Sequence, residues 1–177
     1  MSDSEFSRTV RADTIGAEPK HIHVEADDAE RAALARRFGL VAIDRLEADM
    51  ELSQPHSDMV ASGRIRAAVG QSCVATGEPV HTQIDEPFTV RFRPPPTVGG
   101  GVEDEIELGE DEMDVIFFDA GDVDVGEAVA QTLALHLDPY PRSPDAETAL
   151  KQAGVKDEGE AGPFGALAAL KDKLEKE

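Results

Sequence analysis

The sequence contains very little of three things on which many small proteins depend, namely cysteine, aromatic side chains and long apolar runs. Among its 177 residues there are one cysteine (Cys73), one tyrosine and no tryptophan. A single cysteine excludes an internal disulfide and is typical of a reducing compartment. No apolar run reaches the roughly 18 residues that a membrane-spanning helix needs, and residues 1–13 lack the apolar core of a secretion signal. We therefore expect a cytoplasmic protein with no membrane partner.

Positive charge is also scarce, and one long interval has none. The chain has 37 Asp and Glu against 17 Lys and Arg, and no Lys or Arg occurs between Arg93 and Arg142, where there are 13 acids. Nucleic-acid binding depends largely on the neutralisation of phosphates, so this charge disfavours DNA and naked RNA. It favours basic proteins as partners, although the charge could equally serve only to keep the protein soluble.

The clearest structural pattern lies in residues 59–92. Apolar side chains fall on odd positions in the first half and on even positions in the second, so each half offers one apolar strand face. The TGEP sequence at 76–79 is a turn signal, because Gly permits positive φ and Pro cannot continue a ladder. A long antiparallel hairpin is predicted, with paired positions whose numbers add to about 155, so that Ile65 faces Val90. The opposite face then carries four arginines: Arg64, Arg66, Arg91 and Arg93.

Helix signals stand on both sides of the hairpin. An aspartate at 27–28 caps a predicted helix that stops at Gly39. Asp124 with Glu127 three residues later has the capping-box spacing, and it opens a second helix that ends at the prolines of 138–141.

Strand signals occur in three further segments. In residues 4–24, apolar and polar residues alternate over short stretches that fit one or two strands. Residues 40–52 predict a strand in which the alternation changes phase between Ile43 and Leu46, as at a β-bulge. The apolar run at 115–118 fits a short buried strand.

Together these patterns predict an α+β fold, in which an antiparallel sheet is built around the long central hairpin, with three helices packed on it and an acidic loop. The loop is 103–114, where eight of 12 residues are Asp or Glu. We expect a single α+β domain over 1–142, a polar linker over 143–162 and a C-terminal amphipathic helix over 163–177. The apolar face of this last helix consists of Phe164, Leu167, Leu170 and Leu174. Whether it docks on the core or on a partner stays open.

The sequence lacks the common catalytic motifs. It has no Gly-rich nucleotide-binding loop, no GxSxG nucleophile motif and no HExxH zinc motif. Cys73 is in phase with the apolar face of the hairpin and is expected to be a buried, inert thiol. His21 and His23 share one face of a predicted strand, which leaves a metal-dependent hydrolase as a remote alternative, but two ligands without a third are weak grounds for a metal site. We predict no enzyme activity, no cofactor and no metal.

Three stretches form an ordered set of motifs. Residues 71–80 read QSCVATGEPV, residues 124–142 begin with DVGE and end with DPYPR, and residues 163–171 read PFGALAALK. The first resembles the Q-x-C-V-x-T-x-E-P-V hairpin of the YceD family, the large ribosomal RNA subunit accumulation proteins. The second resembles that family's acidic strand end, helix and PYPR stop, and the third resembles its PF-x-x-L-x-x-L-K helix. The resemblance spans most of residues 40–174.

The resemblance implies a role in the synthesis or accumulation of large-subunit (23S) ribosomal RNA in bacteria or plastids. Genes of the family often lie beside one for a large-subunit ribosomal protein, and no catalytic residues are established for it. Some relatives have extra cysteines suited to a metal, whereas this chain has only Cys73. The expected function is a non-enzymatic factor that supports synthesis, processing or accumulation of 23S rRNA. The alternative is an acidic chaperone or adaptor for a basic protein unrelated to ribosomes.

Binding residues are expected on the arginine face of the hairpin, and in the turn and helix-end residues of the three family motifs. The arginines could bind phosphates. However, a turn at 54–58 would place Glu47 of the preceding strand close to Arg64, and Glu47 and Asp49 would then neutralise the arginine face as a cross-strand charge ladder. The expected partner is a ribosomal protein or a pre-ribosomal particle, direct RNA contact stays open, and DNA is not expected. The candidate binding residues are Arg64, Arg66, Arg91, Arg93, Glu78, Pro79, Asp138, Pro139, Tyr140, Pro141, Arg142, Pro163 and Phe164.

Overall fold

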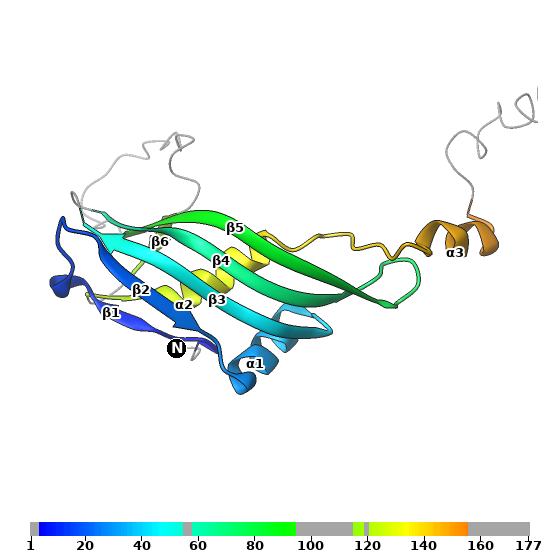
Figure 1. Ribbon diagram of the computed structural model, residues 1–177, viewed down its shortest axis with the longest axis horizontal. Helices are drawn as coiled ribbons and strands as arrows, with labels where there is room; N and C mark the ends of the chain where they lie inside the picture. Colours follow the sequence, from blue (N-terminus) through cyan, green and yellow to red (C-terminus); the bar gives the residue numbers. More distant parts are fainter. Residues whose placement is uncertain (1–3, 55–57, 95–114, 119–120, 156–177) are drawn as a thin grey trace, which may run out of the picture. The chain divides into compact units, whose positions relative to one another are not determined.

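The computed structural model describes residues 4–54, 58–94, 115–118 and 121–155 (Figure 1). The strands are β1 (Thr9–Arg11), β2 (Lys20–Glu25), β3 (Ala42–Ser53), β4 (Met59–Ser72), β5 (Pro79–Arg93), β6 (Val115–Phe117) and β7 (Asp122–Asp124). The helices are α1 (Asp28–Phe38), α2 (Val125–Leu135) and α3 (Ala146–Gln152), and a single 3-10 turn, Ala12–Thr14, follows β1.

Five of the strands form one sheet in the order β2-β3-β4-β5-β6, and β1 pairs with β7 in a separate two-stranded sheet. The pairings of β2 with β3 and of β3 with β4 are antiparallel, whereas β6 runs parallel to β5. The predicted α+β class and the central hairpin, formed by β4 and β5, are confirmed. The predicted third helix, 163–177, lies outside the described residues, and α3 falls within 143–162, where a polar linker was predicted.

The chain forms two compact units. The first comprises residues 1–71 and 81–138, and it contains both sheets with α1 and α2. The second comprises residues 72–80, at the tip of the hairpin, and 139–177, with α3.

The core of the first unit lies against one face of the five-stranded sheet. Alternate side chains of β3, β4 and β5 are buried there, as the parity of the sequence predicted, and α1 and α2 cover them with Leu34, Val129 and Leu133 (Figure 1). The buried residues of the hairpin include Met59, Ala61, Ile65, Ala67, Val69, Ile84, Phe88, Val90 and Phe92. Burial of this continuous apolar face is the main favourable contribution to folding.

The strand register shows one correct prediction and one error. The register of β3 against β4 shifts between Ile43 and Arg45, which confirms the predicted bulge. In the hairpin, the Cys73 amide donates to the Glu78 carbonyl at 2.7 Å. Their numbers add to 151 rather than to about 155, so the predicted pairing is wrong by four residues. The parity is unaffected because the shift is even.

The apolar run at 115–118 also differs from its prediction. It contains β6, which is a strand as expected, but one at the edge of the sheet. Val115 and Ile116 are only half-buried, and Phe117 is exposed. The run is therefore not a buried central strand.

Aspartates cap both long helices. The Asp27 carboxylate accepts from the Glu30 amide while the Glu30 carboxylate accepts from the Asp27 amide, which forms a complete capping box. The Asp124 carboxylate accepts from the amide of Glu127 at 3.0 Å. Gly39 ends α1 in the left-handed conformation with φ 65°.

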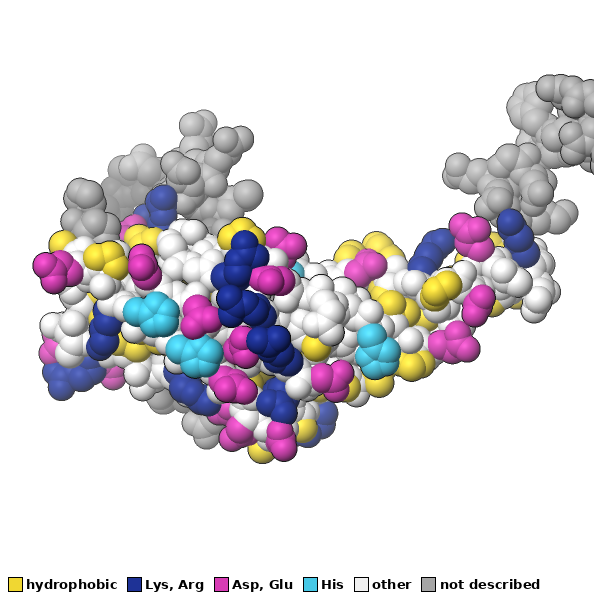
Figure 2. Space-filling model, in the orientation of Figure 1, with side chains coloured by type: hydrophobic (Ala, Val, Ile, Leu, Met, Phe, Trp, Pro, Cys, Tyr) yellow, Lys and Arg dark blue, Asp and Glu magenta, His cyan; other side chains and the backbone are white. Residues whose placement is uncertain are grey.

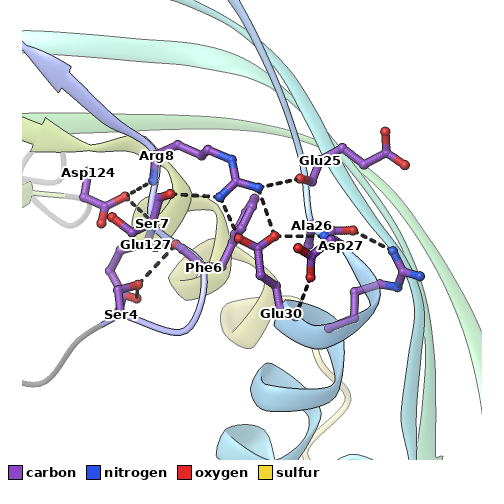
Figure 3. A network of polar contacts seen from close by, with 11 residues as sticks. Ser4, Phe6, Ser7, Arg8, Glu25, Ala26, Asp27, Glu30, Asp124 and Glu127 are labelled. Atoms are coloured by element: carbon purple, nitrogen blue, oxygen red, sulfur yellow. Dashed lines mark hydrogen bonds and ion pairs between the residues drawn. The ribbon is translucent and has the colours of Figure 1, made fainter.

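The N-terminal segment is held against the start of α2 by a polar network (Figure 3). The Arg8 amide donates to the same Asp124 oxygen that caps α2, at 2.8 Å, and the Arg8 guanidinium binds both carboxylate oxygens of Glu30 at 2.7 and 2.9 Å. A Cβ on Gly126 would lie 2.6 Å from the Phe6 carbonyl oxygen. A glycine is therefore required where the two backbones meet.

Glu127 is the most strongly perturbed acid of this network. Arg37 binds both of its carboxylate oxygens, at 2.7 and 2.9 Å, and the Ser4 hydroxyl donates to it at 2.7 Å. The hydrogen bonds from Arg37 are the largest cause that lowers the pKa of Glu127, to about 2. The carboxylate therefore stays charged in the folded protein at pH values where an ordinary glutamate is neutral.

Replacement of Glu127 by glutamine is expected to remove a pH-dependent part of the stability. Because the folded-state pKa lies below the ordinary value of 4.5, this part is complete above pH 4.5 and is lost as the pH falls towards 2. At pH 7, Glu127→Gln should lower the free energy of unfolding by about 2 kcal/mol, which is less than the shift alone implies because Arg37 is partly exposed. Urea denaturation of both proteins at pH 7, 5 and 3 measures the difference.

The stability difference between wild type and Glu127→Gln should shrink between pH 5 and pH 3. Glu86→Gln, which changes an exposed acid of β5, is the control and should follow the wild type. A difference that stays constant with pH would contradict the assignment.

Candidate functional site

Two stretches that are far apart in the sequence meet in the second unit, at the tip of the hairpin. The Val74 amide donates to the Pro141 carbonyl at 2.9 Å, and the Ser143 amide donates to the Cys73 sulfur at 3.3 Å. The hydroxyls of Thr76 and Ser143 lie 3.4 Å apart. The QSCVATGEPV and DPYPR motifs, which lie far apart in the sequence, therefore contribute to one tip site, defined by residues 72–80 and 139–143.

A tight turn sets the shape of the tip site. Gly77 has φ 77°, its amide donates to the Cys73 carbonyl at 2.9 Å, and its carbonyl accepts from the Ser72 hydroxyl at 3.1 Å. Glu78 and Pro79, which follow at the exposed end of the turn, are both solvent-accessible. This conformation favours glycine, because other side chains rarely adopt positive φ.

Cys73 lies at the centre of the tip site, and only 3% of it is exposed. Its predicted burial is confirmed, but the thiol is not an ordinary one. The Thr76 hydroxyl, followed by the amide and the hydroxyl of Ser143, lowers the pKa of Cys73 to about 6. These donors stabilise the thiolate, and the hydrogen bond from the Ser143 amide to the sulfur joins the two stretches.

The outer side of the tip site combines apolar and polar side chains. Val74 and Tyr140 are 55% and 72% exposed, and Pro139 and Arg142 are also exposed, whereas Pro141 is buried. Exposed apolar side chains beside polar ones are typical of protein interaction surfaces. Sequence reasoning missed Thr76 and Ser143, although a hydroxyl residue inside the first motif and one directly after the second were visible signals.

Asp138, another candidate residue, belongs to the end of the first unit. Its carbonyl accepts from the Gln71 side-chain amide at 2.8 Å. The Oε1 atom of Gln71 is buried and has no hydrogen-bond partner within the described part of the chain.

The four arginines lie on the solvent-facing side of the sheet, and three of them form ion pairs. Arg66 binds Asp49 at 2.8 Å and Glu47 at 3.5 Å. Arg64 binds Asp85 at 2.7 Å. Figure 2 shows basic and acidic side chains interleaved across this face.

The remaining two arginines lie near the end of β5. Arg93 binds Asp58 at 2.8 Å. Arg91 alone of the four has no acidic partner among the residues described. The prediction that Glu47 lies close to Arg64 is wrong, because Glu47 is opposite Arg66 in the register and Asp49 is opposite Arg64. The predicted charge ladder is only partly present, because Glu47 and Asp49 both pair with Arg66, whereas Arg64 and Arg93 pair with Asp85 and Asp58.

The two histidines of β2 lie over the same acid. His23 Nδ1 is 2.8 Å from an Asp49 oxygen, and His21 Nε2 is 4.0 Å from it. Within the described ranges, no group of three His, Cys, Asp or Glu residues is placed to hold a metal ion.

A groove of about 330 Å³ lies between α2 and the edge of the sheet, in the first unit. Sequence reasoning did not predict it. The available signal was Leu135, an apolar residue of α2 outside the stripe that contains Val129 and Leu133. The lining residues are Pro87, Phe88, Thr89, Val90, Val115, Ile116, Ala128, Gln131, Thr132, Leu135 and His136.

Two predicted features fall outside the described residues. These are the acidic block 103–114 and the start of the C-terminal helix, with Pro163 and Phe164. Both stay predictions. No helix in the described part of the chain is long and apolar enough to cross a membrane.

The family model described as "Large ribosomal RNA subunit accumulation protein YceD" matches residues 61–171. The matched region begins in β4 and includes both stretches of the tip site and every residue that lines the groove. No curated protein and no solved structure matches the chain.

Titration of the single cysteine tests the geometry of the tip site. Thiolate absorbance near 240 nm should give a midpoint close to pH 6 for Cys73 in the wild type. Thr76→Ala removes the strongest donor and should raise the midpoint towards the ordinary value of 9.0. Because the folded-state pKa is lowered, the stability that the thiolate contributes should grow from pH 6 to pH 9 and be lost as the pH falls through 6.

The control for this titration is Thr82→Ala, which removes a hydroxyl of β5 within the first unit. It should leave the midpoint unchanged. A wild-type midpoint near 9, or one that Thr76→Ala does not move, would show that the tip donors do not act on Cys73.

Proposed function

Because this chain belongs to the YceD family of large ribosomal RNA subunit accumulation proteins, we propose that it supports accumulation of 23S rRNA by binding a basic ribosomal protein. Family membership implies the role in large rRNA subunit accumulation. The binding mechanism is the part that is proposed, and we place it in the cytoplasm.

The observation that carries this mechanism is the distribution of charge. The interval 94–141 has 13 acids and no Lys or Arg, and the whole chain has a formal net charge of −20. Such a field attracts basic segments and repels phosphates. Ribosomal proteins are basic because they neutralise rRNA phosphates, so an acidic binder can hold one before it joins RNA.

The sheet face supports the choice of protein over RNA. Three of its four arginines are already paired with acids of this chain. Phosphate binding would have to break these pairs or use Arg91 alone, which is too little charge for substantial nucleic-acid affinity.

The mechanism requires binding rather than chemistry. The YceD family is not known as a family of enzymes, and the lowered pKa of Cys73 has neutral hydroxyl and amide groups as its causes. In this interpretation the tip site, with Glu78, Pro79, Pro139, Tyr140 and Arg142 on its outside, contributes a second contact for the partner.

Depletion of the protein is expected to lower 23S rRNA relative to 16S rRNA. Complementation of the depleted strain with charge variants tests which acidic residues this role needs. The test variant replaces four acids of the acidic block 103–114 by their amides: Glu110, Asp111, Glu112 and Asp114. The control variant changes net charge equally, through exposed acids elsewhere: Glu18, Asp44, Glu51 and Glu147. We expect the control to restore the 23S level fully and the test variant to leave it about twofold lower.

The two possible failures have different meanings. Normal 23S rRNA and normal subunit profiles after depletion would overturn the function, and would favour an acidic chaperone for some protein unrelated to ribosomes. Equal rescue by both variants would remove the acidic interval from the mechanism while the family role stands.

A further inference from the structure

The groove beside α2 exists because β6 is short. β6 pairs with β5 only from Arg91 to Arg93. Among the residues described, no strand lies beside β5 at Pro87–Val90 on that side, and α2 forms the opposite wall of the groove. An open strand edge next to a helix offers backbone groups and an apolar surface together.

The floor of the groove is apolar, its walls also contain the polar side chains of Thr89, Gln131, Thr132 and His136, and its end is exposed. Phe88, Val90 and Ala128 belong to the core, so the floor of the groove is the outer surface of packed side chains. Leu135 stands at the last turn of α2 with 76% of it exposed. An exposed apolar side chain at the end of a groove that has an apolar floor and a few polar groups is typical of a binding site.

The charge around the groove selects its occupant. No Asp, Glu, Lys or Arg lines it, and all of its α2 and β6 residues belong to the interval 94–141, which has no basic residue. The charged residues of that interval that the structure describes, Asp122, Asp124, Glu127 and Asp138, are all acids, and the chain as a whole has a formal net charge of −20, so a basic partner is favoured over an acidic one. A basic segment with an apolar residue at its centre is complementary to this charge and to the apolar floor of the groove.

We propose that this groove binds a short basic segment of a protein partner, with one apolar side chain of that segment as the anchor beside Leu135. The inference rests on the function proposed above and names the site and the chemistry of its partner. A volume of about 330 Å³ accommodates one or two large apolar side chains. Such an anchor supplies most of the affinity in small interfaces, and the basic flanks speed and orient the encounter.

Other occupants fit the groove less well. RNA would bring phosphates to a wall without a basic side chain. A second copy of this chain would bring a net charge of −20 to a surface of the same sign.

Two labelled dodecapeptides test the proposal by fluorescence anisotropy with the full-length protein. Both have the same Lys and Arg residues, and one has Leu-Phe at its centre where the other has Ser-Ser. The test variant is Leu135→Glu and the matched control is Val41→Glu, which alters an apolar residue that is 57% exposed outside the groove. Both substitutions add one negative charge at an exposed position, so neither should unfold the protein, and thermal denaturation checks this.

The wild type should bind the Leu-Phe peptide about tenfold more tightly than the Ser-Ser peptide. Leu135→Glu should abolish this preference although it adds attraction for a basic peptide, and Val41→Glu should retain it. NMR shifts on addition of the Leu-Phe peptide should map to 87–90 and 131–136.

Three results would overturn the proposal. The first is equal binding of the two peptides, and the second is equal binding of the Leu-Phe peptide by Leu135→Glu and Val41→Glu. Either would mean that attraction is purely electrostatic, and the proposed function would stand without the groove. The third is binding of a 12-nucleotide uridine oligomer that Leu135→Glu weakens and Val41→Glu does not, which would assign the groove to RNA.

Discussion

Side-chain alternation along the β4–β5 hairpin is the constraint on which the rest of the structure depends. Once Ile65, Val90 and their in-phase neighbours are buried under α1 and α2, every intervening side chain must face solvent. The arginines occupy those positions, and the same geometry brings Asp49 of β3 opposite Arg64. The sheet therefore has an apolar face that holds the helices and a charged face whose members largely neutralise one another.

The same alternation sets the environment of the tip site. Cys73 continues the inward phase of β4 past Ser72, the last residue of that strand. Its partners there are hydroxyl and amide donors of Thr76 and Ser143 rather than core side chains. A position that would be an inert thiol inside the core thus becomes a hydrogen-bond acceptor for the 139–143 stretch.

Local signals in the sequence predicted much of the fold. Parity predicted the hairpin and its buried face, the phase slip after Ile43 predicted the bulge, and the aspartates before α1 and α2 predicted their caps. These features depend on residues within a few positions of one another. The hairpin register was wrong because it depends on the conformation of the turn around Gly77, which composition alone does not determine.

The features that sequence reasoning missed depend on distant residues. Asp85 pairs with Arg64 and Asp58 pairs with Arg93. No local sequence pattern predicts either ion pair. The groove depends on where β6 ends along β5. Leu135 can be identified as a groove residue only when that pairing is known. The tip site was predicted in pieces, because family resemblance identified both motifs but only folding brought them together.

The central claim is that this YceD-family chain acts on large-subunit rRNA through a basic protein that it binds directly. Affinity capture from lysate, treated with nuclease and washed at low and high salt, tests this claim most directly. We predict that a large-subunit ribosomal protein stays bound after nuclease treatment at low salt and is released at high salt, since exposed charge attraction is screened by ions. Capture of rRNA whose digestion releases every ribosomal protein would contradict the account.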